Sequence, residues 1–166
     1  MVRTMKGRFI PKNPHKYIGD VTKIIFRSSW ELNALKFFDQ SSAVLKYASE
    51  EIKIPYISPI DGKVHNYFPD FIIIYLDSTG AQKKEILEIK PLSQTILTDK
   101  SSNHDILAIK INEAKWAAAT IFATQRGWIF RIITELSIFK QHKKPPRPRI
   151  KTTKTTIGTK PGKRSI

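Results

Sequence analysis

Cysteine is absent from the 166-residue sequence, which excludes a disulfide scaffold, a thiol nucleophile and any cysteine-ligated zinc or iron–sulfur site. Long apolar runs are also missing: the longest candidate, residues 71–76, has the length of a strand, whereas a membrane span needs roughly 18 residues. Without a glycine-rich phosphate loop, neither a P-loop hydrolase nor a nucleotide cofactor is expected. Residues 1–16 lack the apolar region of a secretion signal, so we expect a protein of the cytoplasm, or of an assembly formed there, and no membrane partner.

Positive charge dominates what is present. Lys and Arg number 29 against 14 Asp and Glu, for a formal net charge of +15. Residues 143–166 hold nine of the basic residues and no acid, so residues 1–142 carry a net charge of only +6. Such a chain attracts polyanions, of which nucleic acid is the commonest, with acidic membrane surfaces and acidic proteins as alternatives. Charge alone does not choose among them.

Composition divides the chain into three segments. Residues 1–22 are rich in Lys, Pro and Gly and show no hydrophobic period, which predicts an extended arm that lies on a surface. Residues 23–142 have the size and apolar content of one domain. Residues 143–166 consist mainly of Pro, Thr, Lys and Arg, and we expect this basic tail to be disordered in isolation.

Hydrophobic periodicity predicts an α/β order of elements within residues 23–142. Ser28 and Glu31 form the Ser-x-x-Glu pattern of a capping box, after which apolar residues recur at helical spacing. Alternating apolar residues between turn clusters indicate strands. The expected elements are a helix over about 29–39, a strand within 43–58, a turn at 58–63, a return strand over 63–76, a turn at 77–80, a strand over 84–90, a helix over 105–126 and a strand over 128–134.

Two carboxylates and a lysine are expected to meet at the ends of two paired strands. Side chains alternate along a strand, so Glu88 and Lys90 point to one face while Ile89 points to the other. If the 77–80 turn pairs its strands antiparallel, Asp70 lies beside them. Carboxylate oxygens are hard ligands for Mg²⁺, so the trio suits metal-assisted hydrolysis of a phosphodiester, with Lys90 orienting water or stabilising charge. An ordinary cross-strand ion pair is the alternative that spacing leaves open.

Six motifs give the sequence a family resemblance. They are Asn-Pro-His-Lys-Tyr at 13–17, Arg-Ser-Ser-Trp-Glu at 27–31, Ile-Pro-Tyr at 54–56, Asp-Gly-Lys-Val-His-Asn-Tyr at 61–67, Pro-Asp-Phe at 69–71 and Glu-Ile-Lys-Pro at 88–91. With the order of elements, they resemble the PD-(D/E)xK nuclease superfamily over roughly residues 26–135. More narrowly, they are similar to the head completion nucleases of T4-type tailed bacteriophages and, less closely, to the TnsA-type nucleases that cleave transposon ends.

The resemblance implies both a fold and a site. The fold is a restriction-endonuclease-like α/β core of αβββαβ order, a mixed sheet flanked by helices, with the N-terminal arm and the basic tail attached. The implied active site consists of Glu31, Asp70, Glu88 and Lys90, with Mg²⁺ or Mn²⁺ bound by Asp70 and Glu88. Glu31 is also the third helical residue of the capping box, which is sufficient reason for a glutamate there without any metal.

Two further residues are accessory candidates. His65 lies two positions before Tyr67, where it either faces the site or contacts a phosphate, and a half-buried strand histidine is the alternative. Gln94 lies just beyond the strand that Pro91 ends, where it is a candidate for binding the DNA backbone or supporting the metal. An ordinary loop residue is the alternative for Gln94.

The resemblance also implies a role. The expected protein is a metal-dependent nuclease for double-stranded DNA that processes packaged DNA and enables head–tail joining. Its protein partners would be head or neck proteins of the portal or connector, and its place the head–neck region of the virion. Three alternatives stay open: a structural head–tail joining plug with little or no nuclease activity, a transposon-type or repair-type endonuclease, and a basic nucleic-acid-binding module without chemistry.

Overall fold

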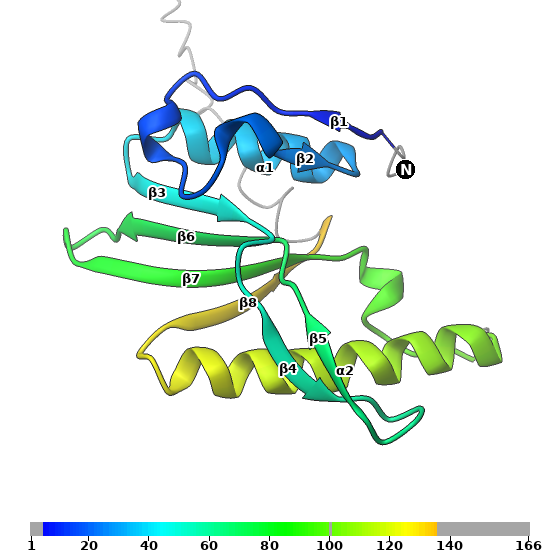
Figure 1. Ribbon diagram of the computed structural model, residues 1–166. Helices are drawn as coiled ribbons and strands as arrows, with labels where there is room; N and C mark the ends of the chain where they lie inside the picture. Colours follow the sequence, from blue (N-terminus) through cyan, green and yellow to red (C-terminus); the bar gives the residue numbers. More distant parts are fainter. Residues whose placement is uncertain (1–4, 100, 136–166) are drawn as a thin grey trace, which may run out of the picture.

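The computed structural model describes residues 5–99 and 101–135 of the chain, which form an α/β domain in three layers (Figure 1). No helix within these ranges combines the length and the hydrophobicity that crossing a membrane requires. The elements in chain order are β1 (Gly7–Arg8), η1 (Pro14–Lys16), η2 (Val21–Lys23), β2 (Ile25–Phe26), α1 (Ser29–Gln40), β3 (Val44–Ser49), β4 (Ile54–Ile57), β5 (Val64–Tyr67), β6 (Phe71–Leu76), β7 (Gln82–Ile89), η3 (Leu92–Gln94), α2 (Asn103–Thr124) and β8 (Ile129–Ile133).

The central layer is a mixed four-stranded sheet of order β3–β6–β7–β8. Strands β3, β6 and β7 pair antiparallel, whereas β8 pairs with β7 in parallel after the chain has crossed over through α2. Helices lie on both faces of this sheet (Figure 1). The predicted α/β class and the order helix, three strands, helix, strand are confirmed for this sheet.

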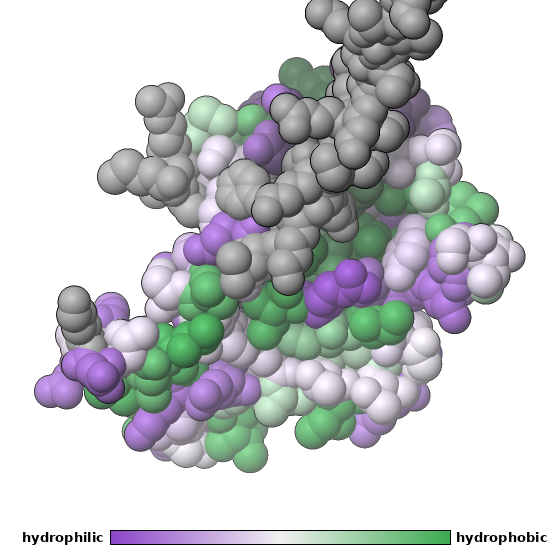
Figure 2. Space-filling view, turned by 180° about the vertical axis from the view of Figure 1, so that it is seen from behind, coloured by the Kyte–Doolittle hydropathy of each residue, from purple (hydrophilic) through white to green (hydrophobic). Residues whose placement is uncertain are grey.

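Each face of the sheet has its own hydrophobic cluster. One face packs against α1 and the N-terminal segment, and the other packs against α2 and the β4–β5 hairpin. Because side chains alternate along a strand, Ile86 and Leu87 of β7 belong to opposite clusters. On the surface seen from behind, hydrophobic side chains occur in patches next to hydrophilic ones (Figure 2).

Two predicted strands are each divided in the structure. The strand predicted within 43–58 consists of β3 and β4, and the return strand predicted over 63–76 consists of β5 and β6. After β3, Glu50 adopts a left-handed backbone conformation with a φ of 56°, and β4 and β5 then form a separate antiparallel hairpin. The turn at 58–63 returns the chain as predicted. The prediction of two long strands is wrong because Ile54 and Tyr56 alternate towards the α2 cluster with the same period that a main-sheet strand would show.

The N-terminal segment differs from the predicted extended arm. Strand β1 pairs antiparallel with β2, and Phe9 and Tyr17 are buried in the cluster that covers one face of the sheet. The boundary at residue 22 is therefore wrong, because residues 5–22 belong to the domain. This segment lacks a hydrophobic period because isolated side chains, rather than one regular face, make its contacts. The predicted tail, 143–166, and the domain end at 142 lie outside the described residues.

Helix α1 is fixed at both ends. At its start, the Ser28 Oγ accepts a hydrogen bond from the Glu31 N–H at 3.1 Å, as the capping box predicts. At its end, the buried Lys16 Nζ donates to three carbonyl oxygens, which belong to Phe38 at 2.9 Å, Asp39 at 3.0 Å and Ser41 at 2.7 Å. The N-terminal segment thus supplies the cation that satisfies the last carbonyl groups of the helix.

Candidate active site

Asp70 stands directly before β6, opposite the end of β7. The antiparallel pairing of these two strands, which the sequence predicts, is confirmed. The Asp70 Oδ2 accepts a hydrogen bond from the Ile89 N–H at 2.7 Å. This bond holds the Asp70 carboxylate beside the strand end that carries Glu88 and Lys90.

The Glu88 carboxylate has a partner on each oxygen. Its Oε1 pairs with the Lys90 Nζ at 3.0 Å, and its Oε2 accepts a hydrogen bond from the Tyr67 hydroxyl at 2.6 Å. Glu88 is 4% exposed and Tyr67 is 5% exposed, so the bond between them lies in the protein interior. Burial and the Glu88 charge raise the pKa of Tyr67, so this phenol stays protonated and acts as a donor.

Burial and neighbouring charge determine the protonation of Asp70. The pKa of Asp70 is raised from 3.8 to about 7, first because the carboxylate is buried and second because the Glu88 charge lies close to it. The Ile89 N–H and the Lys90 ammonium favour the ionised form and oppose this rise, whereas the more distant Glu31 adds to it. A substantial fraction of Asp70 therefore keeps its proton near neutral pH.

Glu31 lies at the border of this group, with its carboxylate on the helix cap. The Ser28 Oγ donates to the Glu31 Oε1 at 2.8 Å, and the Arg27 N–H donates to the Glu31 Oε2 at 2.7 Å. The Glu31 charge still acts on Asp70, because it contributes to the raised pKa of that carboxyl. The structure thus shows Glu31 bonded at the start of α1, with the Arg27 N–H in place of the Ser28 N–H of a full capping box, and the catalytic role of Glu31 stays a prediction.

Asp70 and Glu88 fit a site for a hard divalent cation. Their carboxylate oxygens are the donors that Mg²⁺ and Mn²⁺ prefer. Over residues 5–99 and 101–135, no three acidic or histidine residues gather into a closed metal cage. A cation held by two carboxylates keeps positions open for water and for phosphate oxygens. A cation bound there would favour ionised Asp70 and so oppose the burial and the Glu88 repulsion that together raise its pKa.

The recorded contacts of the two accessory candidates are with residues other than the acids. His65 is exposed on β5, and its Nε2 lies 2.9 Å from the Asp61 Oδ2 within the same hairpin. Gln94 is exposed in η3, where its N–H donates to the Pro91 carbonyl oxygen at 2.9 Å. Among the described residues, no recorded hydrogen bond or ion pair joins either of them to Asp70, Glu88 or Lys90, and their roles in DNA or metal binding stay predictions.

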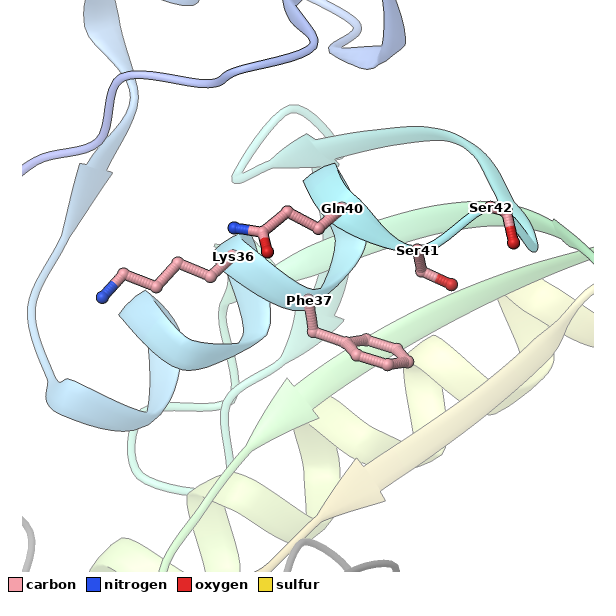
Figure 3. Close-up of a pocket in the computed structure, with 5 residues that line it drawn as sticks. All are labelled: Lys36, Phe37, Gln40, Ser41 and Ser42. Carbon is pink, nitrogen blue, oxygen red and sulfur yellow. The ribbon is translucent and has the colours of Figure 1, made fainter.

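A pocket of about 430 Å³ lies at the far end of α1 from Glu31 (Figure 3). In the close-up, the Lys36 and Gln40 side chains extend to one side of the helix and the Phe37 ring to another. The lining residues are Lys36, Phe37, Gln40, Ser41 and Ser42. None of them is acidic and none belongs to the candidate active site, so the pocket is separate from the chemistry proposed below.

Comparison with known proteins identifies the family. Residues 41–135 match the TnsA-like endonuclease N-terminal domain, and this match covers more than half of the chain. The chain belongs to the TnsA-like endonuclease family. It is also 36% identical over 137 residues to the head completion nuclease of Enterobacteria phage T4, an alignment that covers 78% of this chain and 90% of that protein. Both resemblances predicted from the motifs are confirmed, and no solved structure matches the chain significantly.

The TnsA-like match contains most of the candidate site. Asp70, Glu88 and Lys90 lie within residues 41–135, together with Tyr67. Glu31 precedes the matching residues and lies in the first turn of α1. Membership of the TnsA-like family, with the mixed sheet and its flanking helices, establishes the restriction-endonuclease-like fold predicted from the sequence.

One residue of the candidate site is not predicted from the sequence. The sequence places Tyr67 in a motif at 61–67 but gives it no role, because a single tyrosine on a strand carries no spacing signal. Its hydroxyl reaches Glu88 only because β4 and β5 leave the main sheet and pack as a hairpin near the end of β7. An alignment of related sequences that links the motif at 61–67 to the motif at 88–91 would have indicated this contact.

Proposed function

We propose that this chain is a Mg²⁺- or Mn²⁺-dependent nuclease that cleaves double-stranded DNA and processes packaged DNA in a phage head so that the tail can join. The observation that carries the proposal is the convergence of Asp70, Glu88 and Lys90 at one sheet end. Membership of the TnsA-like endonuclease family and the relationship to a head completion nuclease support a phage head-related DNA nuclease.

The proposed chemistry assigns one task to each side chain. Asp70 and Glu88 would hold the divalent cation, which would polarise the scissile phosphate and lower the pKa of a bound water. Tyr67 fixes one oxygen of Glu88 and thereby orients this ligand. The Lys90 side chain is 27% exposed, so its ammonium can reach both Glu88 and solvent. There it orients the attacking water or stabilises the charge that develops on the phosphate.

The net charge of the chain supports the proposed substrate, and its similarity to a phage protein supports the proposed location. A formal charge of +15 favours DNA, whose phosphates attract Lys and Arg without regard to sequence. The related protein of phage T4 is named a head completion nuclease, which supports a place in the virion head. We infer contact with neck proteins of the portal or connector, because the proposed role is to process packaged DNA so that the tail can join.

Cleavage of linear and circular DNA in Mg²⁺, in Mn²⁺ and in EDTA tests the enzymatic part. We expect cleavage with either metal and none in EDTA, and cutting of the circle would identify an endonuclease. Lys90→Ala and Asp70→Asn should each abolish cleavage while the protein stays folded. Lys83→Ala and Asp77→Asn are matched controls, because these residues form a Lys–Asp pair of 3.9 Å at the opposite ends of β6 and β7.

Assembly with the inactive variant tests the biological part. If joining requires chemistry, particles made with Lys90→Ala should accumulate as filled heads without tails. If the variant supports joining at the wild-type level, the chain acts as a structural plug in which the nuclease is dispensable. Cleavage at the wild-type rate by both Lys90→Ala and Asp70→Asn would instead show that the active site lies elsewhere.

A further inference from the structure

An ion pair between Arg27 and Glu50 borders the candidate active site. The Arg27 Nη1 and the Glu50 Oε1 are in contact, although the residues come from different parts of the chain. Each partner is also tied to a site acid through its backbone. The Arg27 N–H donates to the Glu31 Oε2 at 2.7 Å, and the Glu50 N–H donates to the Asp70 carbonyl oxygen at 3.2 Å. The pair is therefore part of the same small region as the acids.

Exposure separates this pair from the acids behind it. The side chain of Arg27 is 54% exposed and that of Glu50 is 40% exposed, whereas the Glu88 side chain is 5% exposed. Arg27 thus faces the solvent from which a DNA strand arrives. The pKa of Arg27 is raised first by its hydrogen bond with Glu50 and further by the charges of Glu31 and Asp70. This cation therefore lies within the electric field of the candidate site.

A negatively charged substrate needs such a cation at the entrance. The acids that suit a metal also repel the phosphates of DNA, and the Lys90 ammonium is already paired with Glu88. Arginine presents a planar fork of donors that binds two phosphate oxygens at once, which is the geometry a phosphodiester offers. Arg27 has this chemistry, and the Glu50 carboxylate contacts one nitrogen of its guanidinium group, Nη1.

The backbone of Glu50 is an independent sign of function. Among the residues that the structure describes, Glu50 is the only non-glycine residue with a positive φ, at 56°. Side chains other than glycine, asparagine and aspartate are uncommon in this conformation, and such strain concentrates at functional sites. A glycine would relieve the strain but would remove the carboxylate that meets Arg27.

We propose that Arg27 binds a backbone phosphate of the DNA substrate, and that Glu50 occupies Arg27 until a phosphate displaces it. This inference rests on the proposed function in taking DNA as the substrate, but it does not require the metal. Glu50 then acts as an internal competitor: it weakens binding of any anion that fails to make the two hydrogen bonds of a well-placed phosphodiester.

The test measures binding of a fluorescent DNA duplex to the full-length protein in EDTA, so that no cleavage intervenes. Arg27→Gln should weaken binding severalfold and reduce the slope of log Kd against log salt by about one phosphate contact. Glu50→Gln should tighten binding. The matched controls are Lys23→Gln and Asp20→Asn, which change an exposed Lys–Asp pair of 3.1 Å. They report the general effect of adding or removing one charge.

A double variant separates the proposed competition from net charge. In the Arg27→Gln background, Glu50→Gln should no longer tighten binding by more than Asp20→Asn does, because the group that Glu50 blocks is gone. Melting temperatures should stay within the range of the controls, since exposed ion pairs contribute little to stability. This comparison distinguishes a phosphate site from a purely structural pair.

Two results would overturn the inference. If Arg27→Gln binds DNA as Lys23→Gln does, or if Glu50→Gln and Asp20→Asn tighten binding equally in the wild-type background, Arg27 and Glu50 form an ordinary surface pair. Wild-type protein that binds DNA but never cleaves it would refute the proposed nuclease while leaving this binding test valid. Wild-type protein that does not bind duplex DNA would refute both.

Discussion

Replacing Asp70 by Asn should stabilise the fold even though it should abolish cleavage. The amide keeps an oxygen that can accept the Ile89 N–H, but it cannot ionise. In the wild type, the pKa of Asp70 is about 7 in the folded protein and 3.8 at its ordinary value. Between these two values the unfolded state releases the proton and the folded state retains it. The free energy of unfolding of the wild type therefore falls as pH rises from about 4 to about 7.

The magnitude follows from the size of the shift. One pKa unit corresponds to about 1.4 kcal/mol, so the rise from 3.8 to about 7 corresponds to about 4 kcal/mol. Relaxation of the site around ionised Asp70 reduces this value, which is therefore an upper bound. Asp70→Asn should escape the loss, so its advantage over the wild type should be absent near pH 4 and largest above pH 7.

Urea unfolding from pH 4 to pH 8, followed by circular dichroism, measures this difference. Asp77→Asn is the control of opposite sign, because hydrogen bonds from Thr79 lower the pKa of Asp77. That variant should be less stable than the wild type at neutral pH and should approach it as pH falls through the folded pKa. Added Mg²⁺ at pH 8 should stabilise the wild type more than Asp70→Asn. A stability difference between the wild type and Asp70→Asn that does not change with pH would refute the reasoning.

Three further predictions concern neighbouring groups and the basic tail. Tyr67→Phe keeps the ring but leaves a buried Glu88 oxygen without its donor, so it should lower the free energy of unfolding by about 1.5–3 kcal/mol and slow cleavage, as urea titration and initial rates would show. Glu31→Gln keeps a side chain that can cap α1 but loses the charge, so lost cleavage with an unchanged melting temperature would identify a role in catalysis, and unchanged cleavage would leave only the cap. Deletion of residues 143–166 removes nine positive charges, so the affinity for DNA should fall and its dependence on salt should flatten. An unchanged salt slope would mean that the tail binds a protein instead of DNA.

Local signals sufficed for two long elements of the fold. The predicted 105–126 helix is observed at Asn103–Thr124, because this stretch is rich in good helix formers and Gly127 follows it. The predicted 84–90 strand is observed at Gln82–Ile89, because Pro91 stops the strand. The proximity of the two candidate site acids could also be predicted, because one turn and the alternation of side chains along β7 suffice to bring Asp70 to Glu88. These inferences need only contacts between neighbouring elements.

The remaining features depend on contacts between distant segments. Glu50, which follows β3, is neither glycine nor proline, the residues that usually mark a break. The sequence therefore does not predict that the β4–β5 hairpin leaves the main sheet. Tyr67 gains its role only from that departure. In the N-terminal segment, Phe9 and Tyr17 fill gaps in a core built by other elements, and no local period announces such isolated contacts.

The lysine that binds the last carbonyl groups of α1 has a consequence for how far the chain can be truncated. Lys16 holds the end of the helix that carries Glu31, yet both residues precede the 41–135 region that matches the family. A fragment limited to that region would keep Asp70 and its neighbours on the sheet but would lose the whole layer that covers Phe71. Its sheet would present a bare apolar face to water, which favours aggregation. The minimal folding unit is thus larger than the segment by which the family is recognised.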